Sequence, residues 1–372
     1  MKFTIERAAL LKSLGHVQSV VERRNTIPIL SNVLLDASDG KLHLTATDLD
    51  LAMIETTAAE VEQPGAVTAP AHMLYDIVRK LPDGSQVAFE HGPDDARLVV
   101  TSGRSRFSLA SLPREDFPVL SDGDMAHKFT LEPGALIKLV DRTRFAISTE
   151  ETRYYLMGIY FHVADSDGQE TLRGVATDGH RLARVDMDVP EGAKGMPGVI
   201  IPRKAVNEIY KLIAESDKPV EIQLSDTKIR FTTGNAVLTS KLIDGTFPDY
   251  TRVIPETNDK MMEADTKLLA EAVDRVSTVS SEKSRAVKIG LDKDKITLSV
   301  TSPDSGSATE ELAVTYDAEP MEIGFNAKYV LDIVSQIESD TTRFQLSDAT
   351  APTIIRDAEA SGTLYVLMPM RV

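Results

Sequence analysis

The sequence predicts an α+β fold of three similar domains, each containing two halves with one helix and several antiparallel strands. Internal repetition is the first observation behind this prediction. Three similar segments place equivalent leucines, 126 and 133 residues apart, at Leu10, Leu136 and Leu269. Three further segments place equivalent isoleucines, 132 and 124 residues apart, at Ile77, Ile209 and Ile333. Because the repeats fill the chain of 372 residues, we expect domains at 1–125, 126–254 and 255–372.

The second observation is an apolar periodicity that is typical of amphipathic helices. Apolar residues recur three or four positions apart, as at Leu10, Leu14 and Val17, so one face of each helix is expected to be buried. The segments with this pattern are residues 8–21, 70–81, 134–147, 202–215, 267–279 and 326–338.

Short β-branched or alternating runs between these helices predict strands, and the turns between the runs predict hairpins. Pairs of such runs flank Asp39-Gly40, Gly103 and Gly234. Helices that cover one face of antiparallel sheets make the class α+β. Two segments rich in Pro, Asp and Gly, 111–125 and 243–260, each contain a Phe-Pro pair, and we expect them to link the domains.

The composition excludes several classes of protein. Hydrophobic residues make up 42% of the chain and charged residues 26%, as in globular proteins. The chain has no cysteine, which excludes thiol catalysis, disulfides and cysteine-ligated metals. The amino terminus is too polar for a secretory signal, and no apolar run approaches the roughly 18 residues of a membrane span, so we expect a cytoplasmic protein.

The formal charge of −16 is distributed unevenly along the chain. The six helical segments together carry +4, which leaves −20 for the remaining residues. One interpretation is that the helical cations lie on ordinary solvated faces. The other is that the helices share a surface that contacts the phosphates of a duplex without reading its sequence. The candidate contacts are Lys12, Arg79, Lys138, Arg142, Arg203, Lys204 and Lys211, with Arg23 and Arg24 in the loop after the first helix.

Motifs for catalysis and for cofactor binding are missing from the sequence. There is no glycine-rich phosphate loop and no nucleophile elbow, and the seven histidines lack the spacing of metal ligands. Residues 165–168, Asp-Ser-Asp-Gly, lack the remaining ligands of a calcium loop, and a hairpin turn is favoured there. Asp178 and His180 could form an acid–base pair, but two such residues in one loop are common by chance. We therefore expect neither an enzyme nor a cofactor.

Comparison of the three repeats with one another singles out two segments. The sequence Gly-His-Arg-Leu at 179–182 occurs only in the middle copy, so the shared fold does not explain it, although drift in a loop would. Met368 and Met370 flank Pro369 at the end of the chain, and methionine adapts to varied apolar side chains.

Several long motifs resemble those of the bacterial sliding clamps, the beta subunits of DNA polymerase III. They run in order along the whole chain as MKFTIER, RNTIPILSNVLL, SGRSRFSLASLPREDFP, TRYYLMGIYF, ATDGHRLA, FPDYTRVIP, EPMEIGFNAKYVLDIV and MPMRV. The resemblance implies the DNA clamp fold and a head-to-tail dimeric ring of six domains, with helices inside and sheets outside. It also implies a processivity factor without enzymatic activity, which encircles double-stranded DNA. Its implied partners are the replicative polymerase, the clamp loader and other replication or repair proteins, bound through short linear motifs.

The resemblance places a peptide-binding cleft between the second and third domains. Its residues would be Leu156, Thr177, Gly179, His180, Arg181, Leu182, Pro248, Arg252, Val253, Val366, Leu367, Met368, Pro369, Met370 and Arg371. The resemblance also supports DNA contacts by Arg24, Tyr154, Tyr155, Arg203 and Lys204. Two positions depart from the family pattern: His72 stands where a basic residue is frequent, and Pro352 where small polar residues are common.

The third repeat ends without a linker, and we expect its edge to meet the first domain of a second chain. Candidate apolar contacts are Phe107 and Val279, and Arg104 would pair with Glu310 or Glu311. The alternative to a clamp is a repeat scaffold that binds peptides only, without encircling DNA. A hydrolase is the weaker alternative.

Overall fold

The computed structural model describes residues 1–371 apart from 93–94, 121–122, 167, 281–284 and 360–361. The chain forms two compact units. Unit 1 comprises Met1–Ile137, Pro190–Met196 and Lys204–Leu242. Unit 2 comprises Lys138–Val189, Pro197–Arg203 and Ile243–Val372.

The six helices predicted from apolar periodicity are confirmed. They are α1 (Arg7–Gln18), α2 (Ala71–Lys80), α3 (Pro133–Arg144), α4 (Arg203–Ala214), α5 (Thr266–Ser277) and α6 (Ala327–Val334). The last helix ends earlier than predicted because the chain tightens into shorter turns, with Gln336 N–H donating to Ile333 O at 2.9 Å and Ile337 N–H to Val334 O at 3.1 Å.

Side-chain caps fix where several helices begin. The carboxylate of Glu6 accepts a hydrogen bond from Ala9 N–H at 3.2 Å before α1, and that of Asp265 accepts one from Leu268 N–H at 2.8 Å before α5. Each cap satisfies a backbone donor that the helix itself leaves without a partner.

A strand, a helix and three strands recur six times in chain order. The first repeat contains β1 (Lys2–Glu6), β2 (Asn32–Ser38), β3 (Lys41–Thr47), β4 (Leu51–Ala58), β5 (Glu60–Gln63), β6 (Gly65–Pro70), β7 (Gln86–Glu90), β8 (Arg97–Ser102) and β9 (Ser105–Ala110). The second contains β10 (His127–Leu131), β11 (Gly158–Ser166), β12 (Gln169–Thr177), β13 (Arg181–Asp188), β14 (Val199–Pro202), β15 (Val220–Leu224), β16 (Lys228–Thr233) and β17 (Ala236–Lys241). The third contains β18 (Lys260–Asp265), β19 (Ala286–Asp292), β20 (Lys295–Ser302), β21 (Gly306–Ala313), β22 (Thr315–Tyr316), β23 (Met321–Asn326), β24 (Thr341–Leu346), β25 (Thr353–Asp357) and β26 (Thr363–Leu367).

Each unit contains two antiparallel sheets. In unit 1 the strand orders are β5-β1-β7-β8-β9 and β10-β15-β16-β17-β4-β3-β2-β6. In unit 2 they are β14-β11-β12-β13-β26-β25-β24-β18-β22 and β21-β20-β19-β23. The pairing of β17 with β4, and of β13 with β26, makes one sheet continuous across each pair of adjacent repeats. We predicted sheets within each repeat; that they join neighbouring repeats is a finding of the structure.

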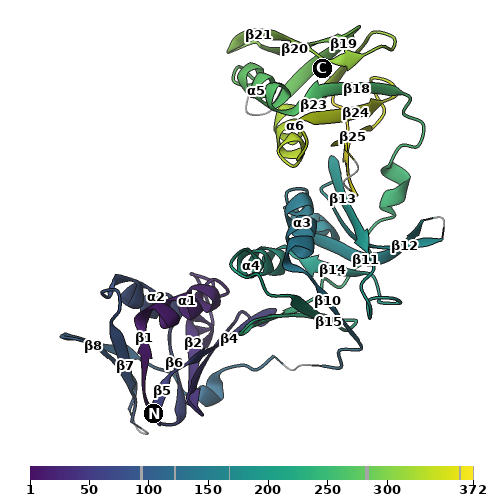
Figure 1. Cartoon of the computed structure of the whole chain (residues 1–372). Coiled ribbons are helices and arrows are strands. Elements are labelled where there is room, and N and C mark those ends of the chain that lie inside the picture. Colours follow the sequence, from purple (N-terminus) through teal and green to yellow (C-terminus); the bar gives the residue numbers. More distant parts are fainter. Residues whose placement is uncertain (93–94, 121–122, 167, 281–284, 360–361, 372) are drawn as a thin grey trace. The chain divides into compact units, whose positions relative to one another are not determined.

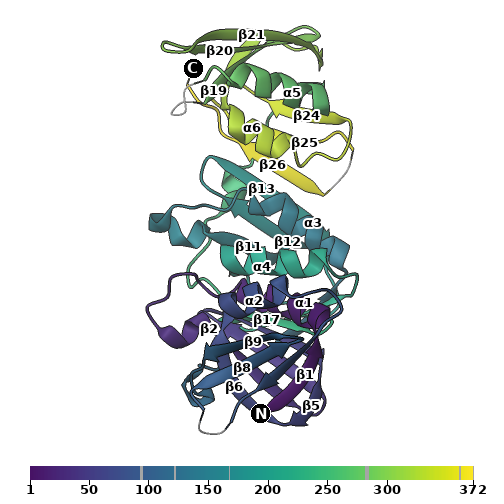
Figure 2. The same cartoon turned by 90° about the vertical axis from the view of Figure 1, so that its left-hand side faces the viewer.

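Helices lie side by side on one face of the sheets, as α1 and α2 do in unit 1 and α5 and α6 in unit 2 (Figures 1 and 2). The predicted apolar stripe of α1 is buried, with Leu10, Leu14 and Val17 fully inaccessible to solvent. Antiparallel strands that are apolar on one face, covered by such stripes, form the α+β class predicted from the sequence.

The predicted hairpins are confirmed. Asp39 and Gly40 have φ angles of 48° and 71° between β2 and β3, the left-handed backbone that a two-residue hairpin turn requires. Residues 165–168 also lie at a hairpin, between β11 and β12, where Gly168 N–H donates to Asp165 Oδ1 at 2.8 Å. Asp167 itself lies outside the described residues.

Both linkers insert the phenylalanine of their Phe-Pro pair into apolar surroundings. Phe117 packs with Ile29 and Leu30, and Phe247 joins an apolar cluster of unit 2 that also contains Tyr250. The linkers are therefore anchored segments of their units. In the described part of the chain, no helix combines the length and apolarity needed to cross a membrane.

Candidate functional site

The cations predicted to contact phosphates fall into two groups, exposed and internally paired. Lys12, Arg23, Arg24 and Arg203 are exposed. Arg79 is exposed too, and pairs with Asp76 one helical turn away at 3.1 Å. An exposed pair of this kind is weak, so Arg79 can exchange its partner for a phosphate at little cost.

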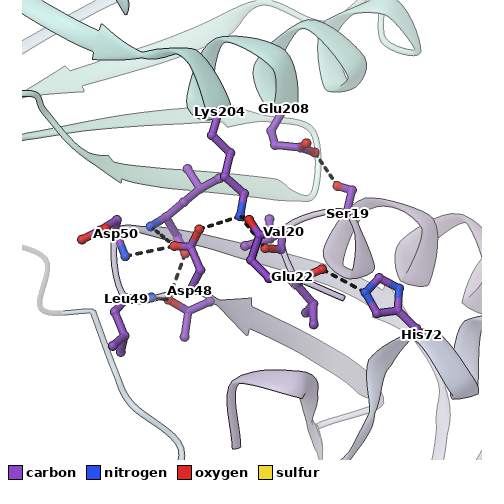
Figure 3. Close-up of polar contacts among 12 residues, drawn as sticks. Ser19, Val20, Glu22, Asp48, Leu49, Asp50, His72, Lys204 and Glu208 are labelled. Atoms are coloured by element: carbon purple, nitrogen blue, oxygen red, sulfur yellow. Dashed lines mark hydrogen bonds and ion pairs between the residues drawn. The ribbon is translucent and has the colours of Figure 1, made fainter. Parts of the chain in front are cut away.

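Lys204 is held within unit 1 by oxygens of the first repeat (Figure 3). Its Nζ donates to Val20 O at 2.9 Å and to Asp48 Oδ2 at 2.6 Å, and it also contacts the carboxylate of Glu22. Burial opposes the charged form, but the hydrogen bonds to Asp48 and Glu22 outweigh burial and raise the pKa of Lys204. The expected phosphate contact is thus engaged as an internal cross-link.

The partner carboxylate of Lys204 also builds the turn between β3 and β4. Asp48 Oδ1 accepts hydrogen bonds from Asp50 N–H at 3.0 Å and from Leu51 N–H at 2.7 Å (Figure 3). Between them Leu49 has a φ of 80°, a conformation that costs energy in a residue with a branched side chain. One carboxylate therefore supports a strained turn and the lysine at once.

Two further predicted contacts are paired with carboxylates of their own unit. Arg142, on α3, is mostly buried and forms an ion pair with Glu338. Lys211 pairs with Glu208 at 2.7 Å, and Glu208 also accepts a hydrogen bond from the Ser19 hydroxyl (Figure 3). Burial and pairing disfavour Arg142 as a phosphate contact, whereas 53% of the Lys211 side chain is exposed and a phosphate would compete there with Glu208. Lys138 is half-buried on α3.

His72 takes a structural role in unit 1. Its Nε2 lies 2.9 Å from the carbonyl oxygen of Val21, in the segment that follows α1 (Figure 3). The ring is half-buried and fixes the start of the loop that carries Arg23 and Arg24.

Two tyrosines of unit 2 were also predicted to contact DNA. Tyr154 and Tyr155 lie in a short 3-10 helix, Glu151–Leu156, with their rings edge to face at a centroid distance of 5.7 Å. Tyr154 is 53% exposed, whereas Tyr155 is half-buried against Gly245. An exposed aromatic ring of this kind can pack against a sugar or base edge.

The turn between β12 and β13 holds the Gly-His-Arg-Leu segment. Asp178 Oδ1 accepts hydrogen bonds from the backbone N–H of His180 at 2.9 Å and of Arg181 at 3.0 Å. Gly179 has a φ of 88°, and a Cβ there would lie 2.5 Å from Nη1 of Arg153. The aspartate is thus committed to the turn, and no acid–base dyad with His180 is formed.

Arg181, which the resemblance places in the peptide cleft, is engaged by groups of unit 2 itself. Its side chain is buried, pairs with Asp178 at 3.2 Å and with Asp332, and donates to the carbonyl of Phe145 at 2.8 Å. The guanidinium also lies 4.3 Å from the ring centroid of Tyr329. Arg181 therefore ties the turn to the third repeat, and sequence reasoning gave no signal for Asp332 or Tyr329.

The carboxyl-terminal segment lies against this turn. In the β13–β26 pairing, Leu182 faces Val366 and Arg181 faces Leu367, and Met368 N–H donates to His180 O at 3.0 Å. Met370 N–H then donates to Gly324 O at 2.8 Å, on the edge strand β23. Backbone pairing thus places the two segments singled out by the repeat comparison side by side.

The apolar residues that the resemblance places in the cleft are only partly accessible. Leu182 and Leu367 are buried beneath the surface, whereas Val253 and Met368 are 44% and 38% exposed and Met370 is half-buried. The buried pair belongs to β13 and β26, which are neighbouring inner strands of the nine-stranded sheet. The accessible apolar surface is therefore Val253, Met368 and Met370.

The second linker carries two further residues that the resemblance places in the cleft. Pro248 and Arg252 are exposed, and Arg252 Nε donates to Asp249 Oδ2 at 2.9 Å.

The other residues predicted for the cleft lie outside the linker. Leu156 and Val366 belong to the buried apolar cluster with Phe247 and Tyr250. Thr177 Oγ1 donates to Arg181 O at 2.7 Å, which stabilises the turn. Pro369 is half-buried and Arg371 is exposed, and both line a hollow beside β23. Pro352 offers only its carbonyl, which accepts a hydrogen bond from Asn258 at 2.9 Å.

Of the residues expected at a chain–chain contact, Phe107, Glu310 and Glu311 lie on edge strands. Phe107 is half-buried on β9, an edge strand of unit 1, and Arg104 is exposed in the adjoining turn. In unit 2, Val279 is half-buried just after α5. Both predicted acidic partners already have cations in their own chain, Glu310 pairing with Arg275 at 2.6 Å and Glu311 with Lys295 at 3.1 Å. Arg104 would have to compete with these cations.

Among the described residues, no group of three or more His, Asp or Glu side chains is arranged to hold a metal ion. The described residues thus include exposed cations, most of them in unit 1, and exposed apolar side chains beside a backbone turn in unit 2. These are groups that bind a polyanion and a peptide.

Models of three related domains match the chain in order. The N-terminal domain of the DNA polymerase III beta subunit matches residues 1–121, the central domain 130–249 and the C-terminal domain 251–371. The beta sliding clamp of Caulobacter vibrioides is 55% identical over 372 residues, and that of Escherichia coli is 41% identical over 373. Each match covers 100% of both chains.

Solved structures are equally similar. A DnaN sliding clamp from Bartonella birtlesii bound to griselimycin matches with a TM-score of 0.97 at 54% identity. The DNA polymerase sliding clamp from Caulobacter crescentus matches with a TM-score of 0.95 at 54% identity. Both comparisons cover 100% of either chain.

Proposed function

The chain belongs to the DNA polymerase III beta subunit family, the DNA sliding clamps, and from this premise we propose that two copies close into a ring around duplex DNA. The resemblance found in the sequence is confirmed, and a sliding clamp is a processivity factor and not an enzyme. The observation that carries the proposal is the match of three clamp domains, in order, along the whole chain. We further propose that the three domains span residues 1–125, 126–254 and 255–372. We also propose that the protein acts on DNA in the cytoplasm.

Two edge strands support a head-to-tail dimer. β9 ends one sheet of unit 1, and β21 ends one sheet of unit 2. Edge strands expose backbone donors and acceptors, so β9 of one chain can pair with β21 of another. Such a heterologous contact, made twice, closes a ring of two chains.

Sedimentation velocity at micromolar concentration tests the dimer. Phe107→Asp places a charge on the apolar side of the β9 edge and is expected to yield monomers. Val119→Asp, at a linker residue that is 86% exposed, is the matched control and should leave the dimer intact. A native protein that sediments as a monomer at this concentration would exclude the ring.

The exposed cations support DNA contact without sequence recognition. Lys12, Arg23, Arg24, Arg79 and Arg203 can approach phosphates, which are spaced regularly along any duplex. Contacts of this kind have no preferred register, so a ring that makes them can slide. With few contacts and a net charge of −16, affinity for short linear duplex is expected in the nonspecific range of about 10⁻⁴ to 10⁻⁶ M.

Retention on circular and linearised plasmid separates encirclement from ordinary binding. After loading, the protein should remain on closed circles at salt concentrations that release it from short duplexes, and linearisation should release it. A scaffold that binds peptides only would be retained on neither DNA. Equal salt sensitivity on circles and short duplexes would remove the topological mechanism.

The surface formed by Val253, Met368, Met370 and the turn at Gly179 and His180 supports binding of a short linear segment. Its exposed apolar side chains can receive one or two Leu or Phe anchors, and the exposed His180 can orient a polar group such as Gln. Polymerases, the clamp loader and repair proteins that carry such segments are the proposed partners.

Calorimetry with a peptide that contains a Gln and two apolar anchors tests this surface. Deleting Met368–Val372 removes the exposed Met368 and the half-buried Met370, and should abolish binding while the dimer persists. Met368→Ala should weaken binding severalfold, and Met73→Ala, at an exposed methionine of α2, should leave it unchanged. Undiminished binding to the shortened protein would show that the cleft is elsewhere.

A further inference from the structure

Strand register places three arginines in one row on a face of the nine-stranded sheet of unit 2. Arg184 of β13 faces Leu364 of β26, and Arg343 of β24 faces Arg356 of β25. The β25–β26 register, in which Ile355 faces Tyr365, brings Arg356 level with Leu364. Residues opposite one another in antiparallel strands point to the same face, so Arg184, Arg356 and Arg343 share it.

This row contains more positive than negative charge. Glu263 pairs with Arg343 at 2.6 Å, and Asp186 is shared between Arg184 at 3.2 Å and Arg173 at 2.6 Å. Within the ranges that the structure describes, Arg356 has no carboxylate partner, and its guanidinium donates only to the amide oxygen of Gln345. The Nε–H groups of Arg184 and Arg356 are buried there without an acceptor.

Such an arrangement costs stability. Like charges directly opposite one another destabilise an antiparallel pair, and buried donors normally have acceptors. Burial, together with the charges of Arg343 and Arg184, lowers the pKa of Arg356, and burial foremost lowers that of Arg184. Natural sequences violate such local rules mostly at functional sites.

The neighbouring row on the same face is apolar and belongs to the peptide cleft. Leu182 faces Val366, Val366 faces Ile354, and each of these residues stands two positions from a member of the arginine row. Leu182, Val366 and Ile354 are buried in one cluster with Phe247 and Tyr250 of the second linker, so the row forms the base of the surface that exposes Val253. Two residues of extended chain span about 7 Å, which is the spacing of the two rows, so a peptide at this surface can reach the arginines within about two residues.

We propose that Arg184 and Arg356 form a carboxylate subsite, which binds an Asp or Glu side chain of the partner peptide two residues from its apolar anchors. This inference rests on the proposed peptide cleft. The Arg184 side chain is 23% exposed and Arg356 is half-buried, so the ends of both guanidinium groups can be reached. A guanidinium binds a carboxylate through two parallel hydrogen bonds, which compensates the excess charge of the row.

Fluorescence anisotropy with three matched peptides tests the subsite. All three share the Gln and the apolar anchors; one has Glu two residues before the anchors, one has Glu two residues after them, and the reference has Gln at both places. One Glu peptide should bind the native protein about tenfold more tightly than the reference at low salt. In Arg356→Gln the preference should fall below about twofold, while the reference peptide binds as before.

Control variants separate the subsite from general electrostatics. Lys293→Gln makes the same change in net charge at an exposed hairpin residue and should keep the tenfold preference. Arg356→Gln relieves repulsion from Arg343, so the thermal midpoint of this variant should not fall. If Arg356→Gln does not fold, the three peptides are compared on Arg184→Gln instead. Equal binding of all three peptides to the native protein, or a preference that survives both arginine variants, would overturn the subsite while the cleft stands. Failure of every peptide to bind would overturn the cleft itself, and the subsite with it.

Discussion

Lys204→Met removes the cation at the centre of the cross-link in unit 1. Its hydrogen bonds to Val20 O and Asp48 would be lost, and Asp48, with 16% of its side chain exposed, would keep a charge without its partner. An exposed ion pair contributes up to about 1 kcal/mol, and breaking a fully buried pair costs about 3–5 kcal/mol. Lys204 is 32% exposed and lies between these limits, so we expect a loss of about 2 kcal/mol.

Thermal unfolding followed by circular dichroism measures this loss. A loss of about 2 kcal/mol should lower the midpoint of unit 1 by about 4–8 °C. Asp48→Asn combined with Lys204→Met should recover most of the loss, because no uncompensated charge remains. Lys218→Met, an exposed lysine just after α4, should leave the midpoint unchanged. An unchanged midpoint in Lys204→Met, with weaker DNA binding, would refute the cross-link and make Lys204 a direct phosphate contact.

Three further outcomes follow from single side chains. Burial opposes protonation of His16, but hydrogen bonds to Glu55 and Glu215 raise its pKa above 6.5. The protonated ring therefore stabilises the fold fully below about pH 6.5, and this stabilisation is lost as the pH rises through the folded-state pKa. The free energy of unfolding of His16→Gln, measured in urea, should vary less between about pH 6 and 8 than that of the native protein. Burial lowers the pKa of His162 to about 4, so the unfolded chain binds a proton at a higher pH than the folded chain does. The stability of the native protein should therefore fall as the pH drops from 6.5 towards 4. An equal fall in His162→Gln would show that His162 does not cause it. Gly179→Ala places a Cβ on a residue with a φ of 88° and against the guanidinium of Arg153. The variant should lose about 1–2 kcal/mol of stability in thermal unfolding and should bind the peptide more weakly in calorimetry. Stability and affinity equal to those of the native protein would show that the turn relaxes to accept the side chain.

Local pattern was sufficient to predict the helices, the repeat and the hairpin turns. The apolar spacing at Leu10, Leu14 and Val17 reflects contacts within about two helical turns, and Asp39-Gly40 specifies its own backbone angles. Such features depend on residues that are close together in sequence.

Partnerships between distant residues could not be predicted in this way. Lys204 finds Asp48 across 156 residues and Arg181 finds Asp332 across 151, because strand pairing between repeats brings them together. No periodicity in a single sequence encodes that register. The sequence therefore named Lys204 and Arg181 as important cations while assigning them contacts with ligands, whereas both bind carboxylates of their own chain.

The strand pairs that join adjacent repeats depend on backbone groups, so they place little constraint on exposed side chains elsewhere. Five residue pairs link β17 to β4 and five link β13 to β26, through backbone groups that every residue type except proline carries in full. Substitutions on the outer side of the second linker, at Pro248 or Val253, therefore leave these joins intact. A lineage can change the residues proposed to meet partner proteins while it inherits an unchanged assembly of repeats.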